Sequence, residues 1–335
     1  MRTSDRLQDY YYFDADIMSA IDDVAERQNR MSFSELANEY GIASGSSSVL
    51  PDGASKPIEI LTLIPDQDYD EQTARIYHTA FGYPINDNTA LHAMRLFEAD
   101  SSEQLIVVGN PAMIGTSTGK LTFREAFEVS KDKTLRPAID PILRYLGQQG
   151  ITTTSHLGYS YGADRAAATI AYSGEYDQSV SKAVLVEPVS VVKRSMKKLA
   201  QDFAQSGQAQ KQYVEQTGSK PYDEIWAEDS AIKFAAWAGG LVRVSNLAIA
   251  HVIAGDGFAQ RAGAALDSQP DLRMTVGWGS KSEICPDLTL QKVTNALRAE
   301  HGRDRVRSMS LRGMHHAGVD DLDLHAAMML EGLRN

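Results

Sequence analysis

The sequence predicts an α/β protein built around a mostly parallel sheet, and three observations lead there. From residue 57 onward, short apolar runs alternate with stretches that have helical spacing. The composition, with 43% hydrophobic and 23% charged residues, is that of an ordinary globular protein. A chain of 335 residues is also long enough to bury a large core without disulfides or structural metals. Alternating strands and helices place helices on both faces of a parallel sheet.

The expected elements follow from the hydrophobic spacing along the chain. We expect strands at residues 58–64, 74–79, 105–108, 153–157, 183–186, 274–278 and 306–311. We expect helices at residues 88–99, 123–129, 138–148, 288–300 and 323–333, and helices filling most of 190–268. No internal repeat is present, so this alternation predicts one doubly wound sheet.

The chain divides into three predicted parts. Residues 1–55 form an N-terminal helical extension and linker, and residues 56–188 and 272–335 form the α/β core. The helical stretch 189–271 interrupts the alternation, with Trp226 among its apolar residues. Such an insertion folds either as a cap over the edge of the sheet or as extra core helices, and we predict a cap.

The N-terminal extension has its own pattern. Residues 16–29 and 33–40 have helical spacing, and the glycine- and serine-rich stretch 41–56 is typical of a linker. The aromatic cluster Tyr10–Phe13 suggests an anchor, because clustered aromatics on a terminal segment favour an interface or a core contact. We therefore expect residues 1–50 to dock on a second copy of the chain or on another protein.

Charge and composition exclude several classes of function. The net charge of -11 argues against a nucleic-acid binder and against an anionic membrane surface. Residues 34–42 resemble the start of a helix-turn-helix, but residues 1–50 hold nine acids against four basic residues. The most apolar stretch, 234–254, is interrupted by Arg243 and falls short of a membrane span. The start of the chain has no apolar core of a signal peptide, which predicts a cytoplasmic protein.

The strongest chemical signal is Gly158-Tyr159-Ser160-Tyr161-Gly162. It directly follows an expected strand and leads into an alanine-rich helix, which is the strand–turn–helix context of a nucleophile elbow. The glycines are needed because side chains would clash with neighbouring backbone in so sharp a turn. The turn would expose the Ser160 hydroxyl above the sheet and aim backbone N–H groups at the same point.

A second Gly-x-Ser-x-Gly match occurs at Gly115–Gly119. It lies six residues beyond the strand 105–108, with Pro111 in between, so it is no direct strand-to-helix turn. We interpret it as a glycine-rich loop that ends near Leu121. The local context therefore favours Ser160 over Ser117 as the nucleophile.

With these motifs the chain resembles the α/β-hydrolases. The likeness rests on Gly158–Gly162, the strand and loop 74–84, the loop 110–117 and residues 312–318, and it covers about residues 57–335. Members of that family carry a serine, an acid and a histidine in this chain order, each at the C-terminal end of a strand. The resemblance implies a hydrolase of the serine esterase or lipase type.

The resemblance also suggests a base and an acid. Serine needs a general base, and His316 stands where the family's histidine does, with His315 as the alternative. The family's usual acid position after the seventh strand holds Ser282, which has no carboxylate. Glu283 beside it and Glu187 at the end of the sixth strand remain the two candidates, and a dyad without an acid is the third possibility.

The oxyanion hole requires two backbone N–H groups directed at the developing negative charge. One belongs to Tyr161, the residue after the nucleophile. By resemblance the other comes from the loop after the third strand, so we expect Ala80 or Phe81 to donate. This chain has His78-Thr79 where His-Gly is common in the family, and a rival position for the loop is 109–111.

Together these features predict a serine hydrolase that cleaves a carboxylic ester through an acyl-enzyme. Its substrate would be a small-molecule or lipid-like ester. No nucleotide-binding or zinc-protease motif occurs, so we expect no cofactor and no metal. The lone Cys285 rules out a disulfide framework and is expected to be a small buried residue. The alternative is an inactive hydrolase-like scaffold that binds a partner through its N-terminal arm.

Overall fold

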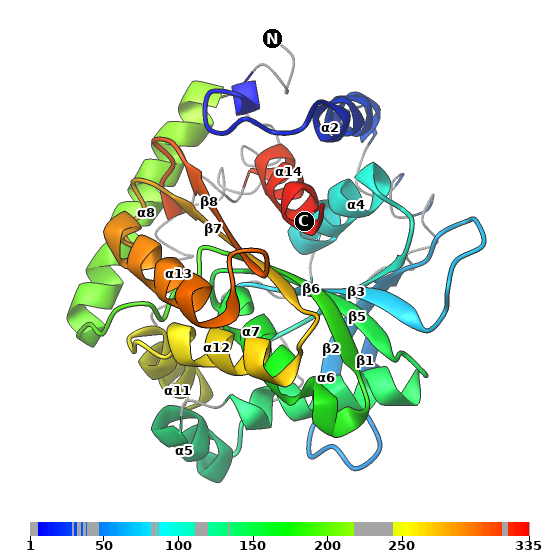
Figure 1. Ribbon diagram of the computed structural model, residues 1–335, viewed down its shortest axis with the longest axis vertical. Coiled ribbons are helices and arrows are strands. Elements are labelled where there is room, and N and C mark those ends of the chain that lie inside the picture. The colour runs from blue at the N-terminus through cyan, green and yellow to red at the C-terminus, as the bar shows by residue number, and fades with distance from the viewer. Residues whose placement is uncertain are drawn as a thin grey trace.

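The computed structural model contains one eight-stranded sheet with the order β1-β2-β4-β3-β5-β6-β7-β8 (Figure 1). The structure describes residues 6–28, 30–31, 35, 38, 47–81, 85, 87–110, 120–132, 135–217, 244–316 and 321–334. Strand β2 runs antiparallel to β1 and β4, and every other neighbouring pair is parallel. The predicted mostly parallel α/β sheet is thereby confirmed.

The strands match the expected apolar runs, apart from their ends. They are β1 (Ser47–Val49), β2 (Ile58–Leu63), β3 (Thr73–His78), β4 (Gln104–Val108), β5 (Thr153–Tyr159), β6 (Ser179–Val186), β7 (Arg273–Gly279) and β8 (Val306–Leu311). The sequence did not predict β1, which lies in the expected linker. Its three residues have no apolar run, and only backbone pairing with β2 makes them a strand.

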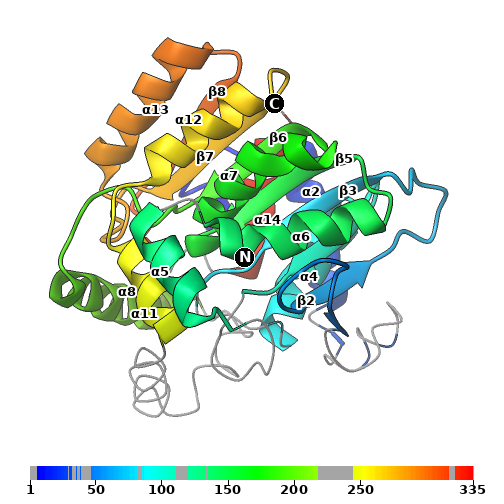
Figure 2. The same ribbon diagram turned by 90° about the horizontal axis from the view of Figure 1, so that it is seen from below.

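Helices cover both faces of the sheet, as Figure 1 and Figure 2 show. One face carries α6 (Arg136–Gln148), α7 (Tyr161–Ser173), α12 (Phe258–Ser268) and α13 (Asp287–His301), with α5 (Phe123–Asp132) and α11 (Val244–Ile253) outside them. The other face carries α2 (Ala15–Gln28), α4 (Asp87–Ala99) and α14 (Leu322–Leu333). Side chains alternate along the strands, so β2, β3, β4, β6 and β8 each place apolar residues on both faces of the sheet.

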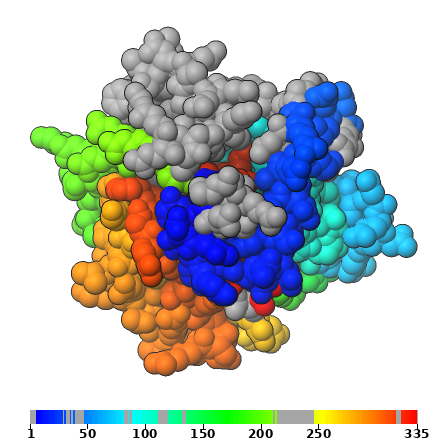
Figure 3. All heavy atoms as spheres, turned by 90° about the horizontal axis from the view of Figure 1, so that it is seen from above, coloured from blue at the N-terminus to red at the C-terminus, as the bar shows by residue number. Residues whose placement is uncertain are grey.

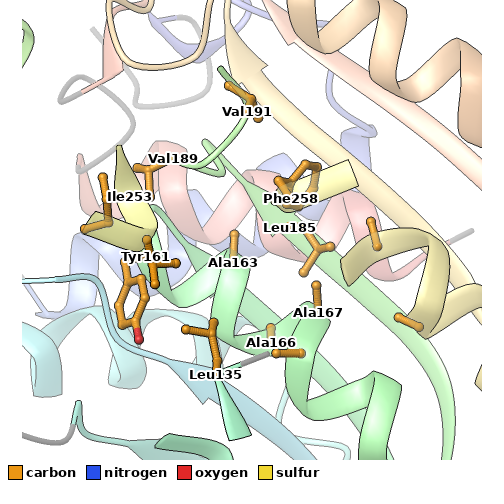
Figure 4. Close-up of a cluster of buried hydrophobic side chains, with 14 of the residues drawn as sticks. Leu135, Tyr161, Ala163, Ala166, Ala167, Leu185, Val189, Val191, Ile253 and Phe258 are labelled. Atoms are coloured by element: carbon orange, nitrogen blue, oxygen red, sulfur yellow. The ribbon is translucent and has the colours of Figure 1, made fainter. Parts of the chain in front are cut away.

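Small side chains on α7 let this helix sit deep in the molecule. Ala163, Ala166 and Ala167 are fully buried and pack among Leu185 and Phe258 from neighbouring elements (Figure 4). Alanine favours the helix, and its small volume allows close approach to the sheet. The helix that begins just after Ser160 is therefore held rigidly at its N-terminus.

The N-terminal segment packs on this chain's own core. Leu7, Phe13, Ile17 and Ile21 are buried in the same apolar cluster as α4 and α14. Figure 3 shows the blue N-terminal segment spread over this face of the molecule. Burial in the chain's own core accounts for most of this anchor, while Tyr12 alone remains 87% exposed. Docking of residues 1–50 on a partner remains a hypothesis.

The stretch 189–271 contains three described helices. Helix α8 (Met196–Thr217) lies beside the ends of β7 and β8 in Figure 1, whereas α12 packs directly against α7 in the core. Trp226 and Phe234 lie outside the described residues, as do residues 32–34 and 39–46 of the extension and the loop 111–119 with Ser117. Among the helices that the structure describes, none has the length and apolar character needed to cross a bilayer. The three-part division of the chain remains a prediction.

Candidate active site

The parallel strands bring the predicted site residues to one edge of the sheet. Ser160 follows β5, Glu187 follows β6, and His316 comes after β8. Backbone hydrogen bonds align the ends: Ser160 N donates to Val186 O at 2.9 Å, and Glu187 N donates to Gly277 O at 2.7 Å. The carboxyl ends of parallel strands share one edge, which is where α/β sheets bind their ligands.

The turn at Ser160 has the strained backbone of a nucleophile elbow. Ser160 has φ 57° and ψ −126°, a conformation that residues with a side chain seldom adopt. A Cβ at Gly158 would lie 2.5 Å from the carbonyl oxygen of Gly162, and a Cβ at Gly162 would lie 2.1 Å from that of His78. The two glycines therefore allow β5, α7 and β3 to meet at the serine.

His316 is paired with Glu187. Its Nδ1 lies 2.7 Å from Glu187 Oε2, and the two side chains are 6% and 0% exposed. Since an ionised carboxylate only accepts hydrogen bonds, Nδ1 carries the proton and Nε2 is left as the basic nitrogen. This is the tautomer that a general base for a serine hydroxyl requires.

Glu187 is held by the loop after β7. Gly279 N donates to its Oε1, and Ser282 Oγ donates to its Oε2 at 2.7 Å. The residue also has a positive φ of 52°, and such backbone strain clusters at functional sites. The position where the family's acid is usual thus holds a serine that hydrogen-bonds to a carboxylate from the preceding strand. Sequence reasoning found Glu187 as a candidate but missed this role of Ser282.

The neighbouring pair, His315 and Glu283, lies further out. His315 Nδ1 is 2.6 Å from Glu283 Oε1, but the side chains are 37% and 19% exposed. Each of the two candidate acids therefore contacts a histidine, and the two contacts differ in how far their side chains are exposed to solvent. Of the two candidate acids, Glu187 contacts His316, the histidine that the resemblance to the α/β-hydrolases favours.

Cys285 lies behind the acid. Its Sγ is 2.9 Å from Pro188 O, and burial together with the Glu187 carboxylate raises the pKa of the thiol well above its usual value. Ligand atoms of Glu187, Cys285 and His316 lie within 4.8 Å of one another, a donor set suited to a soft divalent cation. In this structure the Glu187 carboxylate contacts His316 Nδ1 and accepts a hydrogen bond from Ser282 Oγ.

Two aromatic residues that the sequence did not single out border His316. The Tyr159 hydroxyl donates to His316 O at 2.9 Å, and the two rings stack with centroids 5.5 Å apart. From α8, the Phe203 ring meets the His316 ring edge-on at 6.2 Å. Tyr159 immediately precedes Ser160, so it links the turn at Ser160 to the loop that carries His316. In the sequence, only the place of Tyr159 inside the Gly-x-Ser-x-Gly motif could have indicated that it lies near His316.

A buried ion pair supports the loop after Glu187. Asp164 on α7 accepts hydrogen bonds from Val189 N at 2.9 Å and from Ser190 N at 3.3 Å, and Arg261 on α12 pairs with the same carboxylate. Both charged side chains are buried. A buried carboxylate that is paired and hydrogen-bonded on several sides fixes the backbone around it.

The expected oxyanion loop lies next to the elbow. Ala80 and Phe81 follow β3, which pairs with β5, and the Phe81 ring meets that of Tyr161 edge-on at 6.3 Å. The rival position at Asn110 follows β4, one strand further from the serine. Residues 82–84 of the loop lie outside the described residues. Sheet order therefore favours Ala80 or Phe81 as the donor beside Tyr161.

Two buried histidines lie under this loop. His78 Nε2 is 2.9 Å from His156 Nδ1 between the paired strands β3 and β5. Burial lowers the pKa of His156 to about 3, and burial, Arg165 and His156 lower that of His78 well below its usual range. Both histidines are therefore neutral at physiological pH and act as packed hydrogen-bonding residues.

Comparison with solved structures finds the same fold. An α/β-hydrolase enzyme from a Medee basin deep-sea metagenome library gives a TM-score of 0.55 at 13% identity, covering 86% of this chain and 98% of that one. The N-formylmaleamic acid deformylase of Pseudomonas putida gives 0.53 at 14%, covering 87% and 100%. The enol-lactonase of Burkholderia xenovorans gives 0.51 at 8%, covering 86% and 100%. No protein-family model matches the sequence, and no curated protein matches it. At such low identities the likeness shows the fold.

Proposed function

Because this chain has the α/β-hydrolase fold, we propose that it is a serine hydrolase that cleaves a carboxylic ester. Ser160 attacks the acyl carbon, and His316 accepts the hydroxyl proton and passes it to the leaving alcohol. His316 then activates a water molecule that hydrolyses the acyl-enzyme. Glu187 holds the imidazole in the required tautomer, and backbone N–H groups of Tyr161 and of Ala80 or Phe81 stabilise the oxyanion.

The observation that carries this proposal is the buried contact between His316 and Glu187 beside a strained serine. The 2.7 Å distance, the 0% exposure of the carboxylate and the φ of 57° at Ser160 occur together at one edge of the sheet. Structural ion pairs alone do not require a strained serine nearby. The combination supports nucleophilic catalysis over a purely structural role.

The bond type is the finer part of the proposal. Structural neighbours include carboxylesterases of a thaumarchaeon, with a TM-score of 0.50, as well as the lactonase and the deformylase described above. Cleavage of an ester or a lactone releases an oxygen leaving group that needs one proton, and His316 can donate this proton. Cleavage of a thioester or an amide uses the same residues, so a series of acyl compounds with different leaving groups discriminates these possibilities.

A fluorophosphonate probe with intact-mass analysis tests the proposal directly. Wild-type protein should gain a single adduct, and Ser160→Ala should gain none. Turnover of p-nitrophenyl acetate should likewise be lost in Ser160→Ala. A folded wild-type protein without adduct or turnover would contradict the proposal.

The alternative, an inactive scaffold that binds a partner, rested on Ser282 and on the N-terminal arm. Ser282 now has a role as a hydrogen-bond donor to Glu187, and most of the arm's anchor residues pack on the chain's own core. Neither feature therefore favours the scaffold over the enzyme. The same probe experiment decides between them.

A further inference from the structure

Asn110, just after β4, holds the candidate oxyanion loop by its backbone. Its side chain is buried, and its Nδ2 donates to Thr79 O at 3.0 Å and to Ala80 O at 2.5 Å. The same nitrogen lies 3.1 Å from the Thr79 hydroxyl oxygen. One side-chain amide thus contacts two successive peptide carbonyls of the loop that follows β3.

These two carbonyls belong to the peptide groups of the proposed donors. The carbonyl of Thr79 shares a peptide plane with the N–H of Ala80, and the carbonyl of Ala80 shares one with the N–H of Phe81. In a trans peptide the C=O and the N–H point in opposite directions. Directing both carbonyls at Asn110 therefore directs both N–H groups away from it. Hydrogen bonding of a carbonyl also polarises the N–H of the same peptide and makes it a better donor.

Arg165 connects this clamp to the nucleophile helix. It lies on α7, five positions after Ser160, and its side chain is fully buried. Its two terminal nitrogens donate to Val108 O and Gly109 O, each at 2.6 Å, directly before Asn110. Burial lowers the pKa of its guanidinium to about 10, so the charge persists at physiological pH. Both hydrogen bonds from this cation to the strand end are charge-assisted, which makes them strong.

The two contacts join the two halves of the oxyanion hole. The first half is Tyr161 N–H, at the start of α7, and the second is the loop Thr79–Phe81. Arg165 ties α7 to the end of β4, and Asn110 ties the end of β4 to that loop. Among the described residues, β4, Gly109 and Asn110 supply no group to the proposed reaction, so the Asn110 side chain acts through the loop.

Resting on the proposed function, we propose that Asn110 and Arg165 are positioning residues that set the orientation of the oxyanion donors. Asn110 aims the N–H groups of Ala80 and Phe81, and Arg165 fixes their distance from Tyr161 N–H. The donors must point at the oxygen in its transition-state position, where a small misalignment costs rate. Loss of the clamp should therefore reduce kcat and leave substrate binding nearly intact.

The test compares Asn110→Ala with Gln178→Ala. Gln178 is a matched control, because its buried side-chain amide also donates to a backbone carbonyl, Leu143 O at 3.0 Å, next to the opposite end of β6. For p-nitrophenyl acetate, Asn110→Ala should lower kcat by about 10- to 100-fold, with KM changed by less than about 3-fold. Gln178→Ala should change both constants by less than about 2-fold, even with a similar fall in Tm.

A transition-state analogue separates orientation from general loss of structure. In a trifluoromethyl ketone adduct, Ser160 Oγ bonds to the carbonyl carbon of the inhibitor. The hydroxyl proton passes to His316, and the former carbonyl oxygen carries the negative charge. The affinity for this inhibitor should fall in Asn110→Ala by the same factor as kcat/KM, because it reports binding of the oxyanion. In Gln178→Ala the affinity should be that of the wild type.

Further variants keep the result decisive. If Asn110→Ala does not fold, Asn110→Asp takes its place, because aspartate has the shape of asparagine but lacks the amide donor. Its matched control is then Gln178→Glu. Arg165→Lys keeps the charge but loses the paired contact, and it should retain more activity than Arg165→Met. Equal effects of the Asn110 and Gln178 variants on kcat in an active enzyme would overturn this inference alone. A wild type that neither labels nor turns over would overturn the proposed function and, with it, this inference.

Discussion

Two adjacent histidines, each beside a glutamate, have almost the same hydrogen-bond distance and very different surroundings. The His316–Glu187 contact is 2.7 Å and the His315–Glu283 contact is 2.6 Å. Side-chain exposure is 6% and 0% in the first pair but 37% and 19% in the second. Distance alone therefore does not assign a catalytic pair. Burial, and the residues that hold the acid, separate the two.

The physical difference is the response to solvent. Near solvent, water competes for both partners of a hydrogen bond, so the outer contact contributes little to stability. Removing one partner of the buried contact leaves the other without its hydrogen bond away from water, which costs about 1–3 kcal/mol or more. Glu187 also accepts hydrogen bonds from Gly279 N and Ser282 Oγ, which fix its orientation. We therefore expect catalysis to depend on the inner pair and to tolerate loss of the outer one.

The sharpest way to break this comparison is to remove each histidine in turn. His316→Ala should lower kcat/KM for an ester by about 10⁴-fold, because the general base is lost. His315→Ala should change it by less than about 3-fold. Steady-state kinetics on both variants decide the matter, and a larger effect of His315→Ala would make the outer pair the catalytic one.

Removing each acid should have the next largest effect. Glu187→Gln should lower kcat by about 10³- to 10⁴-fold, since the imidazole loses the partner that fixes its tautomer. Glu283→Gln should remain within about 3-fold of wild type in the same assay. Equal losses in the two variants would contradict the assignment of Glu187.

The acid can also be moved to sharpen the comparison. In Glu187→Ala with Ser282→Asp, the new carboxylate stands where the hydroxyl now meets Glu187. The double variant should recover about 10-fold or more of the kcat lost in Glu187→Ala. A double variant no more active than Glu187→Ala would show that position 282 cannot serve His316.

Burial also separates histidines by their effect on stability. His156 has an ordinary pKa of about 6.5 when unfolded, and burial lowers it to about 3 in the fold. Below about pH 6.5 the unfolded chain therefore binds a proton that the folded chain does not. The free energy of unfolding should be highest above that pH and fall towards pH 3, by about 1.4 kcal/mol per pH unit for each such histidine.

Denaturant unfolding at pH 7.5 and pH 5 measures this slope. His156→Gln, whose side chain does not titrate, should flatten it. The same slope in the wild type and in His156→Gln would argue that His156 does not contribute to the pH dependence.

Ser282→Ala should lower activity less than loss of His316 or Glu187. The Ser282 hydroxyl gives one hydrogen bond to a charged carboxylate, worth about 1.5–3 kcal/mol, and the other contacts of Glu187 remain. We expect kcat to fall by about 10-fold and the activity lost to reappear in Ser282→Thr, which keeps the hydroxyl. An unchanged kcat in Ser282→Ala would remove Ser282 from the set of positioning residues.

Local signals in the sequence determined most of the secondary structure and the elbow. Apolar runs predicted seven of the strands with small errors at their ends, because burial on both faces of a parallel sheet requires them. The motif Gly158–Gly162 predicted the sharp turn. A Cβ at either of its glycines would lie too close to a carbonyl oxygen, so only glycine fits there. β1 escaped prediction because its three residues are ordered by pairing and not by their own composition.

Only the tertiary structure decided which groups meet. Glu187 and His316 are 129 positions apart, and the order of β5, β6, β7 and β8 in the sheet brings them together. The roles of Ser282 and Asn110, and the packing of the N-terminal segment on α14, depend on the same long-range arrangement. Hydrophobic spacing encodes which residues are buried, but the contacts of polar side chains arise from sheet order and loop geometry. The sequence therefore left two candidate acids and a dyad without an acid open, and the fold paired one candidate, Glu187, with His316.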